Sequence, residues 1–341
     1  MVETGSKNIV IAIDAMGGDF GPYETVIGSL DGARAHGVDI LLVGDEDLVE
    51  NVLSRENTEG VNVSVIPSFG KIAEGENPIK ALRAQPRASV STCVRLLKEN
   101  RANAMVTMGS TGAAMASATL GLGLLDSLER PCIGGPVLGM APNTSILDLG
   151  SNIDSRPTQL LNFATMGCVF ARKFFEIRFP RVALLSVGSE KGKGNRQIKD
   201  AYPIFAQSHL NFIGNVEGFD LLSNKADVIV CDGFVGNIIL KFAEAMGDAA
   251  SVFLEAHLHG KIKDIELSAL KYEMWKLTNI STQMSGPLFG VDGNVIIGHG
   301  ASKSAEIGGA METAKRCVEL DLVKGIKDEL EILKKGFGSQ I

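Results

Sequence analysis

Glycine and polar residues gather in short segments that directly follow apolar, β-branched runs of the chain. In the first of these segments, residues 14–22, Asp14, Gly17, Gly18 and Asp19 come after the apolar run 9–13. Adjacent glycines allow a backbone to turn sharply or to approach a ligand closely. An apolar run, a glycine turn and then an amphipathic pattern are typical of a strand, a loop and a helix. We therefore expect the first loop of a ligand site here.

Comparable segments recur along the chain. Helix N-termini with free backbone N–H groups bind anions, and the carboxyl edge of a parallel sheet gathers such turns. Any one of these segments is also compatible with ordinary turn chemistry, but their repetition favours a phosphate or phosphoryl ligand. The candidate substrate- and phosphate-binding residues are Asp14, Gly17, Gly18, Asp19, Gly109, Ser110, Thr111, Gly112, Asp154, Asn195, Asp232, Gly233 and Lys241.

Cations and amides in the same segments are the candidates for direct contact with a reacting group. Lys191 and Lys193 are either phosphate ligands or solvated loop charges, and His299 is either a site residue or a turn histidine. Lys241 either reaches back to an anion or is solvated. The candidate catalytic residues are Lys191, Lys193, Asn237, His299 and Asn152.

The common signatures of nucleotide and hydrolase sites are absent from the sequence. It contains no G-x-G-x-x-G, no G-x-S-x-G, no H-E-x-x-H and no complete P-loop, although residues 188–194 resemble a P-loop superficially. The 5 cysteines are widely spaced and form no C-x-x-C pair, which favours reduced core residues over disulfides or a zinc site. We expect no metal and no cofactor.

Composition indicates a well-packed globular protein. Hydrophobic residues make up 45% of the 341 residues, and the 39 glycines imply many turns. The net charge of -7 argues against a general nucleic-acid binder. The longest weakly polar run, 113–125, is too short and too rich in small residues to span a bilayer, and no signal peptide is expected before the first strand. We expect a cytoplasmic protein that is soluble or at most peripheral to a membrane.

The order of the expected elements favours one α/β fold. Short β-branched runs alternate with amphipathic stretches, which is typical of βαβ units and a mainly parallel sheet. We expect a loop over residues 71–87 and a long C-terminal helix over 302–334, interrupted near residues 308 and 309. Two successive helical stretches over about 248–281 interrupt the alternation. We interpret residues 1–341 as one α/β catalytic domain that carries this helical excursion.

Taken together, the glycine-rich segments resemble the bacterial PlsX family of phosphate acyltransferases. The resemblance rests on residues 13–19 (Ile-Asp-Ala-Met-Gly-Gly-Asp), 109–113 (Gly-Ser-Thr-Gly-Ala), 147–154 (Leu-Asp-Leu-Gly-Ser-Asn-Ile-Asp), 211–217 (Asn-Phe-Ile-Gly-Asn-Val-Glu) and 231–237 (Cys-Asp-Gly-Phe-Val-Gly-Asn). It covers nearly the whole chain. Ser110 departs from the family pattern, which has Asn there, and the centre of the 188–195 segment and residues 285–287 also differ.

The resemblance implies a fold and a reaction. The expected fold is a three-layer α/β/α arrangement with a mainly parallel sheet, similar to isocitrate and isopropylmalate dehydrogenases and to phosphate acetyltransferases. The expected reaction converts an acyl group on acyl carrier protein and inorganic phosphate into fatty acyl phosphate for phospholipid synthesis. The family also implies a homodimer, peripheral association with the inner membrane face and the downstream acyl-phosphate acyltransferase as a further partner.

The chemistry of these reactants agrees with the candidate residues. Phosphate is an anionic nucleophile at neutral pH and a thioester loses a thiolate, so positioning and oxyanion stabilisation suffice. Asp14, Asp154 and Asp232 would orient the donors rather than bind phosphate directly, because carboxylates repel it. Acyl carrier protein is acidic, so basic residues such as Arg172, Arg181 and the lysines of 261–276 are candidates for docking it.

Three alternatives remain open at this point. A phosphotransacylase would act on short acyl-CoA, and a decarboxylating dehydrogenase of similar fold would act on a 2-hydroxy acid. A non-enzymatic scaffold would bind lipid through the 248–281 helices without turnover.

Overall fold

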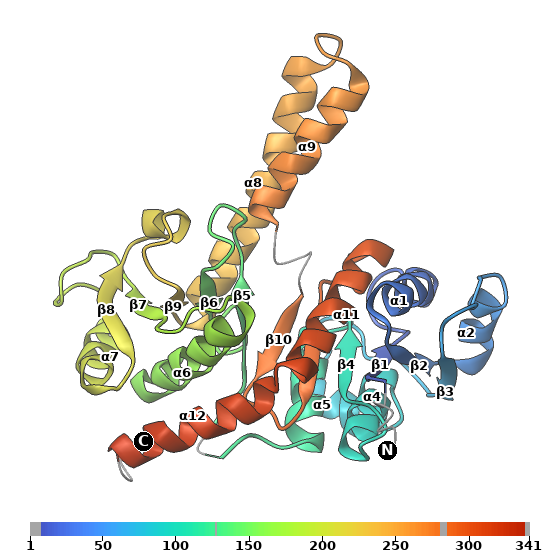
Figure 1. Ribbon diagram of the computed structural model, residues 1–341, viewed down its shortest axis with the longest axis horizontal. Coiled ribbons are helices and arrows are strands. Elements are labelled where there is room, and N and C mark those ends of the chain that lie inside the picture. Colours follow the sequence, from blue (N-terminus) through green and yellow to red (C-terminus); the bar gives the residue numbers. More distant parts are fainter. Residues whose placement is uncertain (1–7, 127, 280–284, 338–341) are drawn as a thin grey trace, which may run out of the picture. The chain divides into compact units, whose positions relative to one another are not determined.

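The computed structural model describes residues 8–126, 128–279 and 285–337, which form two compact units (Figure 1). The first unit comprises Met1–Leu125 and Thr282–Val323, and the second comprises Asp126–Ser281 and Lys324–Ile341. The expectation of a single catalytic domain over residues 1–341 stays a prediction.

The first unit is built on a mainly parallel sheet. Its strands, in spatial order, are β3 (Val63–Pro67), β2 (Asp39–Gly44), β1 (Val10–Asp14), β4 (Ala104–Thr107), β11 (Asn294–Ile297) and β10 (Gly286–Phe289). Neighbouring strands are parallel except for β10 and β11, which are antiparallel. Ile11, Ala12 and Ile13 are fully buried, because β1 lies inside the sheet with helices on both faces.

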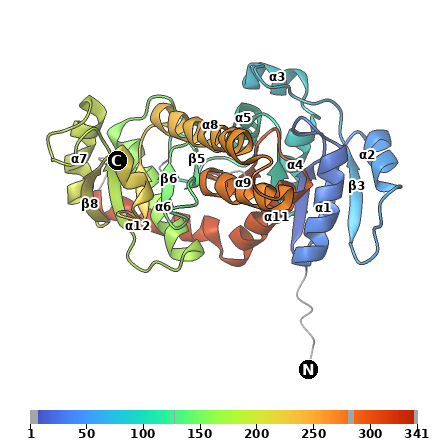
Figure 2. The same ribbon diagram turned by 90° about the horizontal axis from the view of Figure 1, so that it is seen from above.

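Helices cover both faces of this sheet. Helix α1 (Tyr23–His36) packs on α11 (Ser304–Glu319), and α4 (Ser89–Lys98) packs on α5 (Thr111–Gly121). Figure 2 shows these two pairs on opposite sides of the strands. The order of the strands reverses between β1 and β4, since β2 and β3 lie on one side of β1 and β4 lies on the other. Ligands of open α/β sheets bind at the carboxyl ends of strands where the order reverses in this way.

The second unit has its own sheet. Strands β6 (Ser145–Leu147), β9 (Val228–Val230), β7 (Arg181–Leu185) and β8 (Asn211–Val216) are parallel neighbours, and β5 (Cys132–Pro136) pairs antiparallel with β6. Helix α6 (Pro157–Phe174) is buried along most of its length and packs on α7 (Arg196–Gln207). The short helix η1 (Gly218–Leu222) follows β8, and α12 (Leu322–Phe337) ends the described chain. The predicted α/β class and the mainly parallel sheet are confirmed.

Two long helices form a hairpin that projects from the second sheet. Helix α8 (Gly233–Leu258) packs along α9 (Asp264–Thr278), as Figure 1 shows in orange. The helix that follows the 232–237 turn therefore continues without a break past residue 248, where the expected excursion starts. Residues 280 and 281 of the expected excursion lie outside the described residues. Phe234, Ile238, Phe242 and Met246, spaced by one helical turn, are all exposed on α8.

Two local expectations were wrong. Residues 71–87 are not a continuous loop, because they contain a helix, α3 (Pro78–Ala84), which Pro78 starts after the Asn77 cap. The preceding helix of this unit is α2 (Glu46–Leu53), which lies before β3 in the chain. The C-terminal helical region is interrupted not at residues 308 and 309 but between α11 and α12, where Asp321 has a φ of 48°.

The cysteines are free thiols in the core. Cys93, Cys132, Cys168, Cys231 and Cys317 are all buried, as expected. Burial raises the pKa of Cys168 and of Cys317 to about 12. None of the helices in the described ranges is long and apolar enough to cross a membrane.

Candidate functional site

A buried carboxylate links two glycine turns at the reversal of strand order in the first unit. Asp14, the last residue of β1, accepts a hydrogen bond on Oδ2 from the Thr107 hydroxyl at 2.7 Å. Thr107 Oγ1 in turn accepts one from the Gly109 N–H at 3.0 Å. Burial raises the pKa of Asp14, and the hydroxyls of Ser89 and Thr107 partly oppose that rise. The turns after β1 and β4 are therefore held together by one hydrogen-bonded chain.

The predicted glycines in the turn after β1 are needed for close backbone approach. A Cβ on Gly17 would lie 2.8 Å from the Gly109 nitrogen, and Gly18 has a φ of +78°. The N–H of Asp19 donates to the Gly300 carbonyl at 2.8 Å. His299 is exposed in the turn after β11, where its Nδ1 accepts from the Ala301 N–H at 3.3 Å. The structure thus brings the turn of His299 beside the turn after β1.

Helix α5 starts at the turn after β4. Its cap is Ser110, whose hydroxyl accepts from the Ala113 N–H at 3.4 Å. The N–H groups of Thr111 and Gly112 belong to the first helical turn, which has no acceptors within the helix. These N–H groups and the positive end of the helix dipole make the turn suitable for an anion.

The main turn of the second unit is organised by Asp148, which the sequence analysis did not single out. Asp148 Oδ1 accepts from the N–H groups of Gly150 and Ser151 at 3.1 and 3.0 Å. Its Oδ2 accepts from the backbone N–H and the amide of Asn152 at 2.7 and 2.8 Å. Burial raises the pKa of Asp148, and these donors, chiefly the Ser151 N–H, oppose the rise. In the sequence, Asp148 is marked by its position after an apolar run and by its place in the 147–154 segment that carries the family resemblance.

Asn152 is buried, and both N–H donors of its side-chain amide are engaged. The amide nitrogen donates to Asp148 and also to the Pro131 carbonyl, at 2.9 Å. The Asn152 carbonyl accepts from the Gly233 N–H at 2.8 Å, which joins the turn after β6 to the turn after β9. This placement favours a positioning role for Asn152 over direct contact with a substrate.

Helix α8 begins at the predicted turn 232–237. Asp232 caps it, accepting on Oδ1 from the Val235 N–H at 2.9 Å. Asn237 is exposed on the first turn of the helix and lies close to Gly150. Lys241, one turn further along, pairs with Glu244 at 2.9 Å. Asn237 therefore presents an amide beside the turn after β6.

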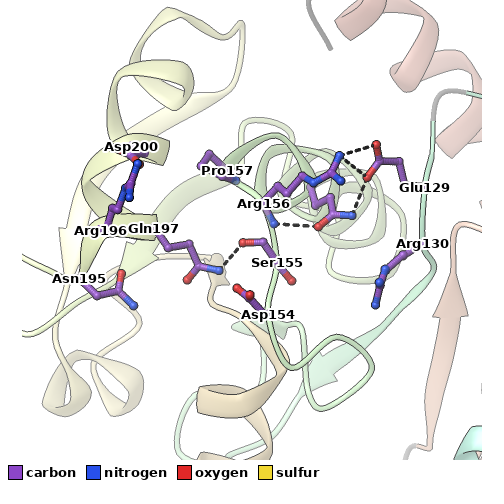
Figure 3. Close-up of a pocket in the computed structure, with 11 residues that line it drawn as sticks. Glu129, Arg130, Asp154, Ser155, Arg156, Pro157, Asn195, Arg196, Gln197 and Asp200 are labelled. Atoms are coloured by element: carbon purple, nitrogen blue, oxygen red, sulfur yellow. Dashed lines mark hydrogen bonds and ion pairs between the residues drawn. The ribbon is translucent and has the colours of Figure 1, made fainter.

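A polar cleft of about 640 Å³ opens in the second unit (Figure 3). Two predicted residues, Asp154 and Asn195, line it, and Asn195 caps α7 by accepting from the Ile198 N–H at 2.9 Å. The remaining lining includes three guanidinium groups that the sequence analysis missed, those of Arg130, Arg156 and Arg196. No motif distinguishes these arginines in the sequence.

The guanidinium groups differ in their pairing. Arg156 pairs with Glu129 at 3.0 Å, and Arg196 lies 3.5 Å from Asp200. Figure 3 shows Arg130 extending below Glu129 without a marked contact to the other residues drawn. Three carboxylates, those of Glu129, Asp154 and Asp200, line the cleft together with the three guanidinium groups. Arg130 is therefore the candidate in this cleft for binding an anionic group.

Lys191 and Lys193 lie in the exposed segment before α7. The Lys191 ammonium lies 5.8 Å from the centre of the Tyr202 ring, and the Lys193 N–H donates to the Glu190 carbonyl at 3.0 Å. Both side chains are exposed.

The predicted residues fall into two groups, one in each unit. The first unit brings together Asp14, Gly17, Gly18, Asp19, Gly109, Ser110, Thr111, Gly112 and His299, and the second carries Asn152, Asp154, Lys191, Lys193, Asn195, Asp232, Gly233, Asn237 and Lys241. Within the described ranges no three His, Cys, Asp or Glu side chains lie close enough to hold a metal ion.

Comparison with solved structures places this fold among known α/β enzymes. A phosphotransacetylase from Streptococcus pyogenes superposes with a TM-score of 0.59 at 16% identity, over 96% of this chain and 95% of that one. A 4-hydroxythreonine-4-phosphate dehydrogenase from Klebsiella pneumoniae gives 0.56 at 12% identity, over 93% and 99%. These similarities concern the fold alone.

Comparison of sequences shows the family. The family described as "Fatty acid synthesis protein" matches residues 9–324. A phosphate acyltransferase from Acaryochloris marina is 41% identical over 92% of this chain and 93% of its own length. One from Heliobacterium modesticaldum is 40% identical over 94% and 97%. The resemblance to the PlsX family is confirmed, and the chain belongs to this family of fatty acid synthesis proteins, the phosphate acyltransferases.

Proposed function

We propose that this protein transfers a fatty acyl group from acyl carrier protein to inorganic phosphate and releases fatty acyl phosphate. The observation that carries the proposal is the pair of glycine turns joined by Asp14, Thr107 and Gly109 where the strand order reverses. Such a crevice suits an anion held by backbone N–H groups. Membership of the phosphate acyltransferase family supports the choice of phosphate as that anion.

The reaction makes modest demands on the protein. A phosphate oxygen attacks the thioester carbonyl carbon, the tetrahedral intermediate collapses, the C–S bond breaks, and the carrier leaves as a thiolate that takes a proton from solvent. Phosphate is already ionised at neutral pH, so no side chain has to activate it. The protein has to bring two anionic reactants together and stabilise the oxyanion.

We assign roles from the placement of each residue. In the first unit, the Gly112 turn holds phosphate through the N–H groups that begin α5, and His299 polarises the thioester carbonyl. In the second unit, Lys191, Lys193, Asn237 and the Gly233 turn stay candidates for contact with a reactant. Asn152 is assigned to positioning, because both of its amide donors are already engaged.

Buried or capping carboxylates support these donors. Asp14 and Asp232 accept hydrogen bonds from Thr107 and from the Val235 N–H, so they hold the turns in shape. Asp154 lines the cleft beside the arginines, where Arg130 is an added candidate for an anionic substrate group.

Docking of an acidic carrier protein would use unpaired surface cations. Arg181 pairs with Asp227 at 2.8 Å, and Arg172 pairs with Glu329, so these two are weaker candidates than the sequence suggested. Lys271 pairs with Glu255 at 2.9 Å in the helical hairpin. Docking by charge should weaken as salt is added.

The exposed apolar side chains of α8 support a homodimer and a peripheral membrane contact as parts of the same proposal.

A substrate comparison tests the proposal. Purified protein is supplied with phosphate and either long-chain acyl carrier protein thioester or short-chain acyl-CoA, and acyl phosphate is trapped with hydroxylamine. The carrier thioester should react at least tenfold faster. A preference for short acyl-CoA would instead identify a phosphotransacylase, and lipid binding without turnover would identify a scaffold.

A further inference from the structure

A lysine that is not among the predicted site residues contacts the first glycine turn. Lys71 donates a hydrogen bond from Nζ to the carbonyl oxygen of Gly18 at 2.6 Å, across 53 positions of sequence. Lys71 lies in the segment that joins β3 to α4, residues 68–88, which we call the strap. The sequence pattern predicted a loop over residues 71–87 of this segment.

The strap holds the Lys71 backbone in a fixed place. At its base, the Phe69 N–H donates to the Arg87 carbonyl at 2.8 Å, and the Arg87 guanidinium lies 4.2 Å from the centre of the Phe69 ring. The Ser68 N–H donates to the Gly44 carbonyl at 2.7 Å, and Ile72, next to Lys71, is buried. These contacts distinguish Lys71 from a lysine on a free loop.

The strap also reaches the second glycine turn of the unit. Helix α3 within the strap packs on α5, and the Pro78 ring lies 3.0 Å from the position that a Cβ on Gly112 would take. A single segment therefore contacts both of the turns that Asp14 and Thr107 link.

The turn after β1 needs a cation if it is to hold an anion. It carries the carboxylates of Asp14 and Asp19, both of which repel phosphate. The positive charge of Lys71 acts on Asp14 and opposes the rise of its pKa. The Lys303 ammonium also lies near this turn, 5.8 Å from the centre of the Phe20 ring. Of these two lysines, Lys71 is the one hydrogen-bonded to the glycine backbone.

We propose that Lys71 is a phosphate-binding residue, which uses one N–H donor to hold the Gly18 turn and offers the others to a phosphate oxygen. This inference rests on the proposed function and adds a residue to its site. An ammonium has three donors, so the bond to Gly18 leaves two for a ligand. Charge-assisted hydrogen bonds of this kind are stronger than neutral ones.

Four variants separate the charge of Lys71 from its packing. Lys71→Met removes the charge and the hydrogen bond, Lys71→Gln keeps a donor without charge, and Lys71→Arg keeps both. Lys80→Met is the matched control, because Lys80 is an exposed lysine on the same strap. For each, kcat and the KM for phosphate are measured at saturating acyl thioester, together with the thermal midpoint.

The wild-type enzyme must first form acyl phosphate, which establishes the proposed function independently. Lys71→Met and Lys71→Gln should then raise the KM for phosphate by about tenfold or more, the scale of a lost charged hydrogen bond. Lys71→Arg should restore most of the affinity, and Lys80→Met should match the wild type. An unchanged KM for phosphate in Lys71→Gln, or equal values in the Gln and Arg variants, would overturn the proposal. Because both of these variants keep a polar side chain, the comparison stays informative if Lys71→Met fails to fold.

Discussion

Asp14 is a carboxylate placed where burial disfavours its charge. Only 2% of the residue is exposed, and burial raises its pKa. At neutral pH its ionised form therefore costs folding free energy, offset in part by the Thr107 hydroxyl and by the charge of Lys71. The sequence predicted that Asp14 belongs to the site. It could not show which groups act on the Asp14 carboxylate, because Thr107 and Lys71 are distant along the chain.

Replacing Asp14 by Asn should change the pH dependence of stability. A group whose pKa is higher in the folded state stabilises the fold fully below its unfolded pKa, near 4, and loses that contribution as the pH rises through the folded value. Asp14→Asn should therefore be more stable than the wild type at pH 7, by a margin that shrinks as the pH falls towards about 4. Urea unfolding across this range measures the margin. A difference that does not vary with pH would contradict the assigned burial effect.

Gly18 should matter for activity and not only for backbone freedom. Its φ is +78°, and a Cβ there would lie 3.0 Å from the Gly300 carbonyl oxygen. Gly18→Ala should destabilise the protein by about 1–2 kcal/mol and lower kcat/KM for phosphate by about tenfold or more. Gly37 is the matched control, since its φ is +64° and nothing lies within 4 Å of its added Cβ. Gly37→Ala should lose stability but keep its activity; equal activity losses in both variants would show that the Gly18 turn has no special role.

At the scale of elements, helix starts were easier to predict than helix ends. Asp232 comes directly after the apolar run 228–231, and Asp45 comes after the run 38–43 and Gly44; each caps a helix. Pro78 was interpreted as a break in a loop, although it begins α3, because proline is equally compatible with the first turn of a helix. The interruption between α11 and α12 falls at Asp321, a residue with no intrinsic preference strong enough to mark it. Sequence patterns therefore located the turns of the site but not the strap that packs on them.

The cap of α8 gives a test at this scale. Asp232→Ala removes the acceptor for the Val235 N–H and should cost about 1 kcal/mol of unfolding free energy. Asp45→Ala removes an equivalent cap from α2, where Asp45 accepts from the Leu48 N–H at 3.2 Å. Denaturant unfolding should show similar losses for the two variants. Only Asp232→Ala should also lower turnover, by about tenfold; full activity in that variant would remove the turn 232–237 from the site.

At the scale of the whole molecule, one face of α8, formed by Phe234, Ile238, Phe242 and Met246, stays exposed in the part of the chain that the structure describes. Phe242 is 66% exposed and Met246 is 49% exposed, one helical turn apart. Such a stripe on a projecting hairpin is typical of an interface with another molecule, and sequence periodicity could not tell it from a core face. The resemblance to a family of homodimers makes a second copy the proposed partner.

Sedimentation equilibrium tests that proposal. The wild type should be a dimer, and the double variant Phe242→Ser with Met246→Ser should raise the dissociation constant by about tenfold or more, because two large apolar side chains lose their buried surface. Phe179→Ser, at a residue that is 70% exposed elsewhere in the second unit, is the control and should leave the dimer intact. A dimer of unchanged affinity in the double variant would place the interface on another surface.

In the proposed reaction, a phosphate oxygen attacks the carbonyl carbon of the acyl thioester. The most direct measurement supplies phosphate labelled with ¹⁸O on all of its oxygens, together with long-chain acyl carrier protein thioester, and follows the products by phosphorus NMR. Acyl phosphate should accumulate with the label retained in the oxygen that bridges carbon and phosphorus. Failure to form acyl phosphate above the protein-free control, or a bridging oxygen without the label, would contradict the account.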